Sequence, residues 1–249
     1  MINRIKRKLK HFIDVRIRLI LNQQRLNEQI TFNYNQISQL FKEESFIPFS
    51  AWAISPSTIL HILNDITINK RKNIIEFGSG ASTFFIAKLI KTLKCESTFY
   101  SIESDKNWAT ELKRQLKIYN LEEYVTIIYA PLIEVSEDLL FKDQKKWYDI
   151  EVLKNSLKSN TEFDLIIVDG PYGGSTPFAR YSAVPFLIDN LALNYSVFLD
   201  DINRTEERLI AAEWEQMLNG NFKYIERYAV LSTAQKFDVT PFQLDSFPI

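Results

Sequence analysis

The sequence predicts an α/β protein with a doubly wound, mostly parallel, seven-stranded sheet, an antiparallel edge hairpin and an N-terminal helical extension. Strand patterns alternate with helical patterns along most of the chain, which is typical of a parallel sheet. The strand patterns are continuous apolar runs such as Leu165-Ile166-Ile167-Val168, as expected for strands buried on both faces. A Gly-x-Gly turn, Gly78-Ser79-Gly80, follows the first apolar run and opens a helical pattern.

The elements follow from local patterns. Ser55-Pro56 marks a helix start that leads into a first strand, Asn73–Phe77. Further strands are expected near residues 97–103, 124–129, 164–169, 196–200, 222–230 and 234–240, the last two forming the edge hairpin. Helices are expected near residues 82–93, 106–118, 177–190 and 205–218, and a longer connection, 130–162, contains Trp147-Tyr148-Asp149 and another helix.

Residues 1–46 form the predicted helical extension, and residues 47–249 the predicted catalytic domain. The first 30 residues hold eight Lys or Arg against two acids, and neither proline nor glycine occurs before Pro48. Apolar residues recur at alternating steps of three and four, with polar residues at the remaining seam positions. Three interpretations stay open: an amphipathic helix packed on its own domain, a homodimer arm, and a contact with an anionic membrane surface. The apolar seam is Ile2, Ile5, Leu9, Phe12, Leu19, Leu26, Ile30, Ile37 and Leu40, and the polar seam residues are Arg16, Gln23 and Asn33.

The glycine turn is the strongest functional signal. Gly78 can adopt backbone angles closed to other residues, and Gly80 lets a ligand approach the main chain without meeting a Cβ atom. The second strand ends in Glu103, where such folds hold a ribose, because one carboxylate can accept from two hydroxyls. Glu76, just before the turn, suits a cationic ligand better than a diphosphate.

These residues resemble the class I S-adenosylmethionine-dependent methyltransferases, whose first motif has the form acid-x-Gly-x-Gly. The matching positions are Glu76, Gly78, Gly80 and Glu103, and the resemblance runs from about residue 54 to residue 237. It implies that the turn lies under S-adenosylmethionine, that Glu76 orients its amino group and that Glu103 holds its ribose. Ser79 and Ser82 would face the cofactor at the helix N-terminus.

Acids end two later strands, at Asp169 and at Asp200-Asp201. Asp169 and Asp200 are the predicted catalytic residues, with Asp169 beside the cofactor as a general base for a hydroxyl. Alternatively Asp169, Asp200 and Asp201 hold Mg²⁺, a cation that prefers oxygen ligands. This arrangement resembles metal-dependent O-methyltransferases that act on catechols and macrolide sugars. A second alternative for Asp201 is capping of the following helix.

Three residues are predicted to contact the substrate: Tyr172, Arg180 and Arg204. Arginine suits an anionic group such as a carboxylate or phosphate, although Arg204 could instead pair with a neighbouring acid. Asp169-Gly170-Pro171-Tyr172 also resembles the Asp-Pro-Pro-Tyr motif of amino-group methyltransferases on nucleic-acid bases, but the glycine departs from that pattern.

Composition narrows the function classes. The formal net charge of −1 predicts no general attraction to nucleic acid, and one cysteine with two histidines leaves no Cys/His metal cluster. No apolar stretch approaches a membrane span or a signal peptide, so a cytoplasmic protein is expected.

The predicted function is therefore methyl transfer from S-adenosylmethionine to a hydroxyl of a small molecule or saccharide, with Mg²⁺ assistance as an option. Three alternatives stay open: N-methylation of an amine or base, aminopropyl transfer, and a non-catalytic scaffold that acts through its N-terminal helix.

Overall fold

The computed structural model describes residues 2–41, 46–233 and 237–243. Its centre is a seven-stranded sheet in the order β3-β2-β1-β6-β7-β9-β8. Neighbouring strands from β3 to β7 pair in parallel, and β9 pairs antiparallel with both β7 and β8. The strand order reverses between β1 and β6, where a doubly wound sheet opens a crevice beyond its strand ends. The bounds are β1 Asn73–Phe77, β2 Thr98–Glu103, β3 Thr126–Tyr129, β6 Phe163–Val168, β7 Leu191–Leu199, β8 Lys223–Ile225 and β9 Tyr228–Ser232.

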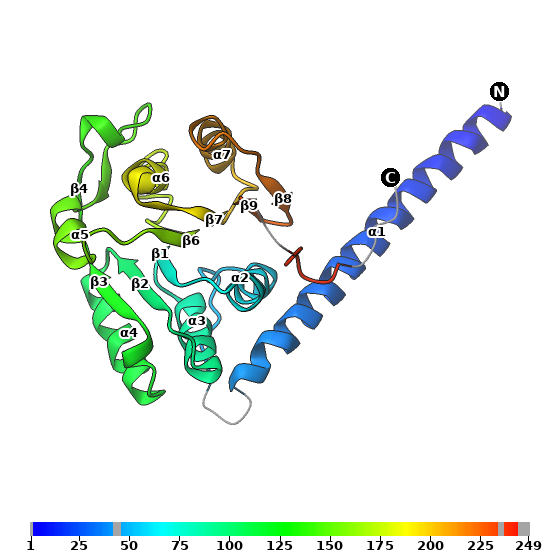
Figure 1. Ribbon diagram of the computed structural model, residues 1–249. Coiled ribbons are helices and arrows are strands. Elements are labelled where there is room, and N and C mark those ends of the chain that lie inside the picture. The colour runs from blue at the N-terminus through cyan, green and yellow to red at the C-terminus, as the bar shows by residue number, and fades with distance from the viewer. Residues whose placement is uncertain (1, 42–45, 234–236, 244–249) are drawn as a thin grey trace.

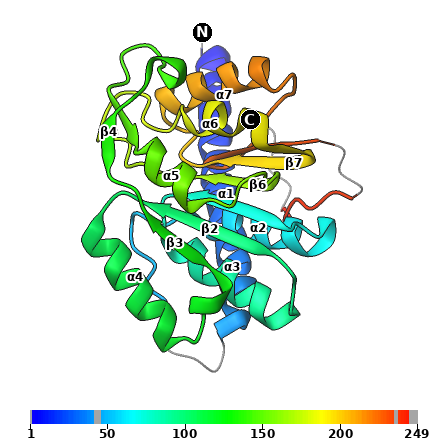
Figure 2. The ribbon, with the colours of Figure 1, turned by 60° about the vertical axis from the view of Figure 1, so that its left-hand side comes forward.

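Helices cover both faces of the sheet (Figures 1 and 2). One face carries α2 Pro56–Asn69, α3 Ala81–Leu93 and α4 Lys106–Ile118. The other carries α5 Ile150–Ser156, α6 Ala183–Leu187 and α7 Thr205–Met217. The predicted start of α2 is confirmed: Ser55 Oγ accepts a hydrogen bond from the backbone N–H of Thr58.

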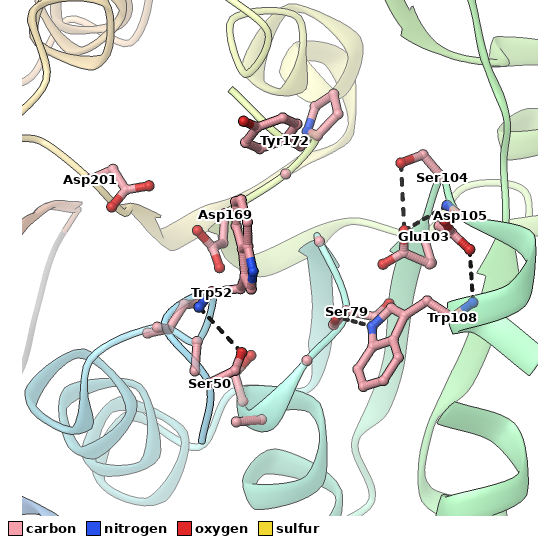
Figure 3. A pocket seen from close by; sticks show the side chains of 18 of the residues that line it. Ser50, Trp52, Ser79, Glu103, Ser104, Asp105, Trp108, Asp169, Tyr172 and Asp201 are labelled. Carbon is pink, nitrogen blue, oxygen red and sulfur yellow. Dashed lines mark hydrogen bonds between the residues drawn. The ribbon is translucent and has the colours of Figure 1, made fainter. Parts of the chain in front are cut away.

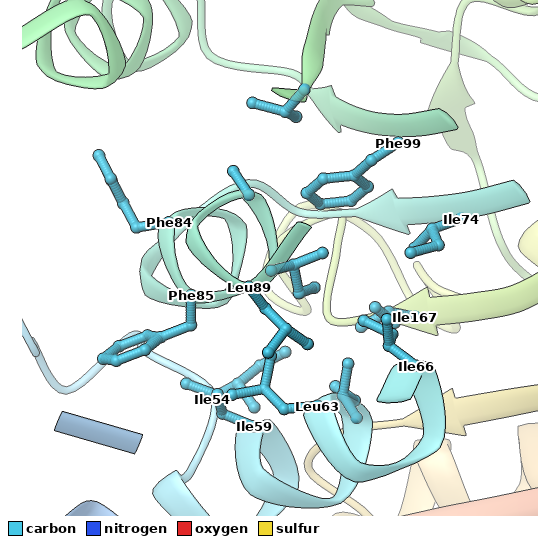
Figure 4. Packing of buried hydrophobic residues seen from close by; sticks show 14 of the residues in the cluster. Ile54, Ile59, Leu63, Ile66, Ile74, Phe84, Phe85, Leu89, Phe99 and Ile167 are labelled. Carbon is cyan, nitrogen blue, oxygen red and sulfur yellow. The ribbon is translucent and has the colours of Figure 1, made fainter. Parts of the chain in front are cut away.

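Apolar side chains on alternate strand positions join the sheet to its helices. In β1, Ile74 contributes to the core under α2 and α3, whereas Ile75 contributes to the core on the opposite face. Figure 4 shows the first of these cores, where Leu63 of α2 and Leu89 of α3 lie beside the strands that carry Ile74 and Ile167. Burial on this scale, about 1.5–3 kcal/mol for each large apolar side chain, holds the strand ends in register.

The long connection after β3 forms a separate hairpin, β4 Leu132–Glu134 with β5 Lys146–Tyr148, followed by α5. Two predicted elements have different bounds. The helix expected at 177–190 is only α6 followed by the short 3₁₀ helix Ile188–Asn190, because Phe178 has a positive φ and Arg180 points into the protein. Strand β7 begins earlier than expected, at Leu191.

The edge hairpin lies at other residues than the sequence predicts. Both of its strands lie within residues 223–232, because a two-residue turn, Glu226-Arg227, joins Ile225 directly to Tyr228. Glu226 has a φ of +50°, which the sequence does not signal, since glycine or asparagine normally occupies such a turn. Of the second predicted strand, residues 234–236 lie outside the described residues and residues 237–240 are not in a strand.

The N-terminal extension is one helix, α1 Ile2–Ser38, followed by the 3₁₀ helix Gln39–Phe41. Its C-terminal part packs against α2: Ile37 is buried, and Asn33 Nδ2 donates to Ser57 Oγ at 2.8 Å. This part of α1 therefore packs on the domain that follows it in the chain. Leu9 and Phe12, from the same predicted seam, are more than half exposed. None of the described helices is long and apolar enough to cross a bilayer.

Candidate active site

A cavity of about 940 Å³ opens beyond the carboxyl ends of β1, β2 and β6. Its size lies in the roughly 300–1,000 Å³ range usual for small-molecule sites. One end is walled by the glycine turn, Glu103 and Trp108, and the other by Asp169, Tyr172 and a group of arginines. Figure 3 shows the two ends facing each other across the cavity. A single cavity therefore offers two chemically different subsites. Its walls include Ser79, Gly80, Ser82, Glu103, Trp108, Tyr148, Asp169, Tyr172, Arg180, Asp201, Arg204, Arg227 and the segment around Trp52.

The turn after β1 depends on its first glycine. Gly78 has a φ of +95°, which L-residues with a side chain rarely adopt. The turn also approaches the end of β6 closely, since a Cβ atom on Gly78 would lie 2.7 Å from the backbone nitrogen of Gly170. Gly80 differs, because a Cβ atom there would meet nothing within 4 Å and its φ of −169° is open to any residue. The backbone at Gly80 thus borders open space where a ligand can approach.

Glu76 is not among the described residues that line the cavity, so the expected contact with a cofactor amino group has no geometric support. Its side chain is fully buried at the end of β1 and accepts hydrogen bonds from the hydroxyls of Ser82, Thr83 and Ser101. Burial raises its pKa to about 7, and these three hydroxyls oppose the shift. Hydrogen bonds to this one side chain therefore connect α3 and β2 to the end of β1, next to the glycine turn.

The helix α3 begins directly after the turn and presents small side chains to the cavity. Ser79 and Ser82, two of the predicted cofactor residues, both line it, and the Ser82 hydroxyl donates to Glu76. Trp108, which the sequence analysis did not single out, donates from its indole Nε1 to the Ser79 carbonyl oxygen at 2.9 Å. The indole ring is thereby fixed beside the turn as an apolar wall (Figure 3).

Glu103 faces the cavity from the end of β2, as predicted (Figure 3). The backbone N–H of Asp105 donates to its Oε1 at 2.7 Å and holds the side chain in place. Burial raises the pKa of Glu103, while the backbone hydrogen bonds act in the opposite direction. A carboxylate held through one oxygen can still accept hydroxyl groups at the cavity.

The predicted acid cluster does assemble. Single oxygens of Asp169, Asp200 and Asp201 lie within 4.8 Å of one another. Arg180, which is 3% exposed, lies among them: its Nη2 is 3.0 Å from Asp169 Oδ1 and 2.9 Å from Asp201 Oδ2. Its Nη1 also donates to the Asp200 carbonyl oxygen at 2.9 Å. Arg180 lines the cavity, but its guanidinium group pairs with Asp169 and Asp201. Fewer of its N–H groups are therefore left for a substrate.

Two further arginines complete the cluster. Arg204 Nη2 lies 2.9 Å from Asp201 Oδ2, so Arg204 forms the ion pair with a neighbouring acid that is the alternative to substrate binding. Asp201 does not cap α7 with its side chain, since Arg204 occupies the N-cap position and no side chain caps the helix. Arg227, at the tip of the edge hairpin, contacts Asp200 Oδ2 at 3.0 Å and also Asp201 Oδ1. Sequence reasoning missed Arg227 because it lies far along the chain, in a turn without a turn signature.

The protonation of the acids follows from their surroundings. Burial raises the pKa of Asp169 well above its ordinary value, and Arg180 opposes this shift. Burial also raises the pKa of Asp200 to about 6, against the effect of Arg227. The two carboxyls are close enough that the charge on one disfavours the charge on the other. Asp169 consequently holds its proton more strongly than an exposed aspartate.

The cluster does not fit Mg²⁺, although the predicted ligands come together. Both oxygens of Asp201 already accept from guanidinium groups. Asp200 Oδ1 has no hydrogen-bond partner among the described residues, but Asp200 Oδ2 accepts from Arg227 and Asp169 Oδ1 accepts from Arg180, so guanidinium groups reach all three acids. Arginines supply the compensating charge, and a dication placed beside their guanidinium groups would be repelled.

Two exposed aromatic side chains flank the acid end of the cavity. Trp52 and Tyr172 are 71% and 58% exposed, and their rings meet edge to face with centroids 5.1 Å apart. Both line the cavity, where Tyr172 is one of the predicted substrate residues and Trp52 carries no signal in the sequence. Aromatic residues this exposed contribute little to the core and offer a surface to a planar or apolar molecule.

No protein-family model and no curated protein matches the chain. Among solved structures, it is similar to the Podospora anserina methyltransferase PaMTH1 bound to SAH, at 15% identity and a TM-score of 0.54, covering 82% of this chain and 86% of that one. It is also similar to an O-methyltransferase from Bacillus cereus in complex with SAH, at 14% identity and a TM-score of 0.52, covering 81% and 90%. The O-methyltransferase TomG of Streptomyces achromogenes, in complex with SAM, matches at 14% identity and a TM-score of 0.51, covering 83% and 90%. The chain thus has the class I methyltransferase fold that its sequence predicted.

Proposed function

We propose that this chain is an S-adenosylmethionine-dependent methyltransferase that methylates a hydroxyl group of a small molecule or saccharide. The observation that carries the proposal is the shared cavity: the glycine turn and Glu103 line one end, and Asp169 lines the other. A transfer reaction needs both a donor and an acceptor subsite in one space, because the reacting atoms must be held in line.

The donor subsite has the features that a nucleoside requires. Glu103 can accept both hydroxyls of a ribose, and Gly80 leaves room for the ligand against the main chain. Trp108 adds an apolar surface beside the turn. The S-adenosylmethionine and SAH in the complexes of similar fold support this assignment.

S-adenosylmethionine would be held by the glycine turn and Glu103, and would supply an electrophilic methyl group bound to its sulfonium sulfur. Asp169 is the candidate base that takes the hydroxyl proton as the new O–C bond forms. Arg180 orients the Asp169 carboxyl and stabilises its charged form. Asp200 acts at a distance, by holding Arg227 and by disfavouring the charge on Asp169. No step requires a metal, because guanidinium groups already compensate the acids.

The acceptor would enter past Trp52 and Tyr172. An exposed aromatic pair at the acid end of the cavity favours a substrate with an apolar face, such as a phenol or a sugar ring. Arg204 is 45% exposed and lines the same end, so an anionic substituent on the acceptor can reach it.

Calorimetric titration with S-adenosylhomocysteine tests the proposal. We expect binding by the wild type, and about tenfold weaker binding or worse for Glu103→Ala, because charge-assisted hydrogen bonds to the ribose are lost. Glu123→Ala, which removes an exposed carboxylate elsewhere, is the matched control and should bind like the wild type. Absence of binding by the wild type would reject the methyltransferase in favour of the scaffold.

A labelled-methyl assay on a panel of phenols, sugars and amines then identifies the acceptor. Mass spectrometry of the product locates the methyl group on oxygen or on nitrogen. Transfer to amines alone would replace the O-methyltransferase by the N-methyltransferase alternative. Turnover only with the decarboxylated cofactor would point to aminopropyl transfer.

A further inference from the structure

The helix α1 is much longer than its contact with the domain. Its 37 residues span about 55 Å at the rise of an α-helix. Among the described residues, three contacts hold the C-terminal part of α1 to the domain: Asn33 donates to Ser57, Gln29 donates to the Phe242 carbonyl oxygen, and Phe32 packs edge to face on Phe242 at 5.9 Å. Figure 1 shows the other half extending beyond the domain. We define residues 6–26 of α1 as the projecting segment.

The projecting segment carries a stripe of exposed apolar side chains. They lie at steps of three and four residues, which places them on one face of the helix. Each is between 46% and 66% exposed, so the domain does not cover this face. An apolar face of this length in water is unusual for an unpartnered helix and indicates an interaction surface. The stripe consists of Leu9, Phe12, Ile13, Ile17 and Ile20.

The charge of the projecting segment identifies the partner. It holds seven basic residues against one acid, Asp14, in a chain whose formal net charge is −1. Arg16 lies within the apolar face, with its guanidinium carbon 5.0 Å from the centre of the Phe12 ring. An arginine in that position can lay its stem along apolar surface while its charged end reaches a phosphate. The basic residues are Lys6, Arg7, Lys8, Lys10, Arg16, Arg18 and Arg25.

We propose that the projecting segment lies in the surface of an anionic lipid bilayer, with its apolar stripe among the acyl chains and its basic residues among the phosphates. A strongly basic amphipathic helix with leucine, isoleucine and phenylalanine on the other face is typical of such interfacial helices. The inference is independent of the proposed enzymatic activity. With the projecting segment in the bilayer surface, the contact of α1 with the domain through Asn33 and Ile37 would hold the catalytic domain at the membrane.

A second copy of the chain fits the same face less well. Pairing two projecting segments would bring two sets of seven cations together with only one acid on each, and like charges repel. Arg16 and Gln23 also interrupt the apolar seam that a helix pair would need to bury. A bilayer of anionic lipid has neither disadvantage, because the charges are complementary and the surface is not restricted to one register.

Co-sedimentation of the full-length protein with vesicles tests the proposal. Vesicles of phosphatidylcholine alone are compared with vesicles in which a quarter of the lipid is phosphatidylglycerol, at low and high salt. We expect binding to the anionic vesicles, weakened by salt. The triple variant Lys6→Gln/Lys8→Gln/Lys10→Gln should lose roughly 100-fold in partition coefficient. Each lysine near such a surface contributes roughly a fivefold factor, and the three factors multiply. The matched control, Lys106→Gln/Lys113→Gln/Lys117→Gln, removes the same charge from exposed positions on α4 and should bind like the wild type.

A second variant tests the apolar stripe. Ile13→Gln/Ile17→Gln/Ile20→Gln keeps good helix formers and should abolish vesicle binding, whereas Leu93→Gln/Ile118→Gln/Leu193→Gln, at exposed positions outside α1, should not. Equal thermal midpoints of all variants show that the domain is intact. Two outcomes overturn the proposal. Either both α1 variants bind vesicles as strongly as the wild type does, or the wild type binds no vesicles and light scattering shows that it is a dimer which the stripe variant abolishes. The latter would assign the face to a second copy.

Discussion

Gly78 and Gly170 lie back to back where β1 and β6 end. A Cβ atom on Gly170 would lie 2.7 Å from the Gly78 Cα atom, and one on Gly78 would lie 2.7 Å from the Gly170 nitrogen. The two strands can therefore approach at the point where the sheet order reverses only because both residues lack side chains. This contact sets the distance between the glycine turn and Asp169, and so between the two ends of the cavity.

The two glycines of the turn should respond differently to alanine. Gly78→Ala meets both a positive φ and a backbone clash, so we expect a loss of about 2–4 kcal/mol in the free energy of unfolding. Gly80→Ala should leave stability within about 0.5 kcal/mol of the wild type and should weaken binding of S-adenosylhomocysteine, because its Cβ atom enters the cavity. Denaturant unfolding and calorimetry measure the two effects. Equal cofactor affinity of Gly80→Ala and the wild type would place the ligand away from this turn.

The arginine-held acids should make the protein indifferent to divalent metal. We expect no Mn²⁺ binding by electron paramagnetic resonance and unchanged S-adenosylhomocysteine affinity after chelation. Arg227→Gln frees oxygens of Asp200 and Asp201 and should create measurable Mn²⁺ affinity. Lys223→Gln, on the same hairpin, is the control and should bind no more Mn²⁺ than the wild type. Stoichiometric Mn²⁺ binding by the wild type would restore the metal site that the sequence suggested.

The buried Glu76 should make stability depend on pH. Its folded pKa of about 7 lies above the ordinary value of 4.5, so the folded state binds more protons than the unfolded state between these values. The stabilisation is present below pH 4.5 and is lost as pH rises through 7. Glu76→Gln removes this dependence while keeping a polar group for the hydroxyls of Ser82, Thr83 and Ser101. Urea unfolding from pH 4.5 to 8 should show a steeper decline for the wild type than for Glu76→Gln; parallel curves would contradict the assignment.

A base at Asp169 should give a rate that rises with pH. Burial raises its pKa well above the ordinary value, so the charged form that accepts a proton becomes more abundant as pH increases. Asp169→Asn should lose at least about a hundredfold in kcat, the usual contribution of a general base, and its remaining rate should be flat with pH. S-adenosylhomocysteine affinity should change much less than kcat. An unaltered pH profile in Asp169→Asn would assign the proton to another group.

Local signals were sufficient where one segment determines its own structure. Ser55-Pro56 at the start of α2, the apolar runs of β1 and β6, and the glycine turn were read correctly because capping, burial and backbone freedom act within a few residues. The placement of Glu103 and Asp169 at one cavity followed from parallel strands ending at one edge. Strand position gives the edge of the sheet but not the direction of a side chain, so the hydrogen bonds of Glu76 to hydroxyls of α3 and β2 could not be predicted.

The sequence by itself determined the α/β architecture, the glycine turn and the acids at the strand ends, because each arises from periodicity or from a residue's own backbone preferences. Only the tertiary structure decided what neutralises those acids. Arg180 comes from the turn before the shortened helix α6 and Arg227 from the tip of an edge hairpin, and they meet Asp201 across 21 and 26 residues. Such pairing depends on how distant segments pack, and neither charge nor spacing along the chain encodes it.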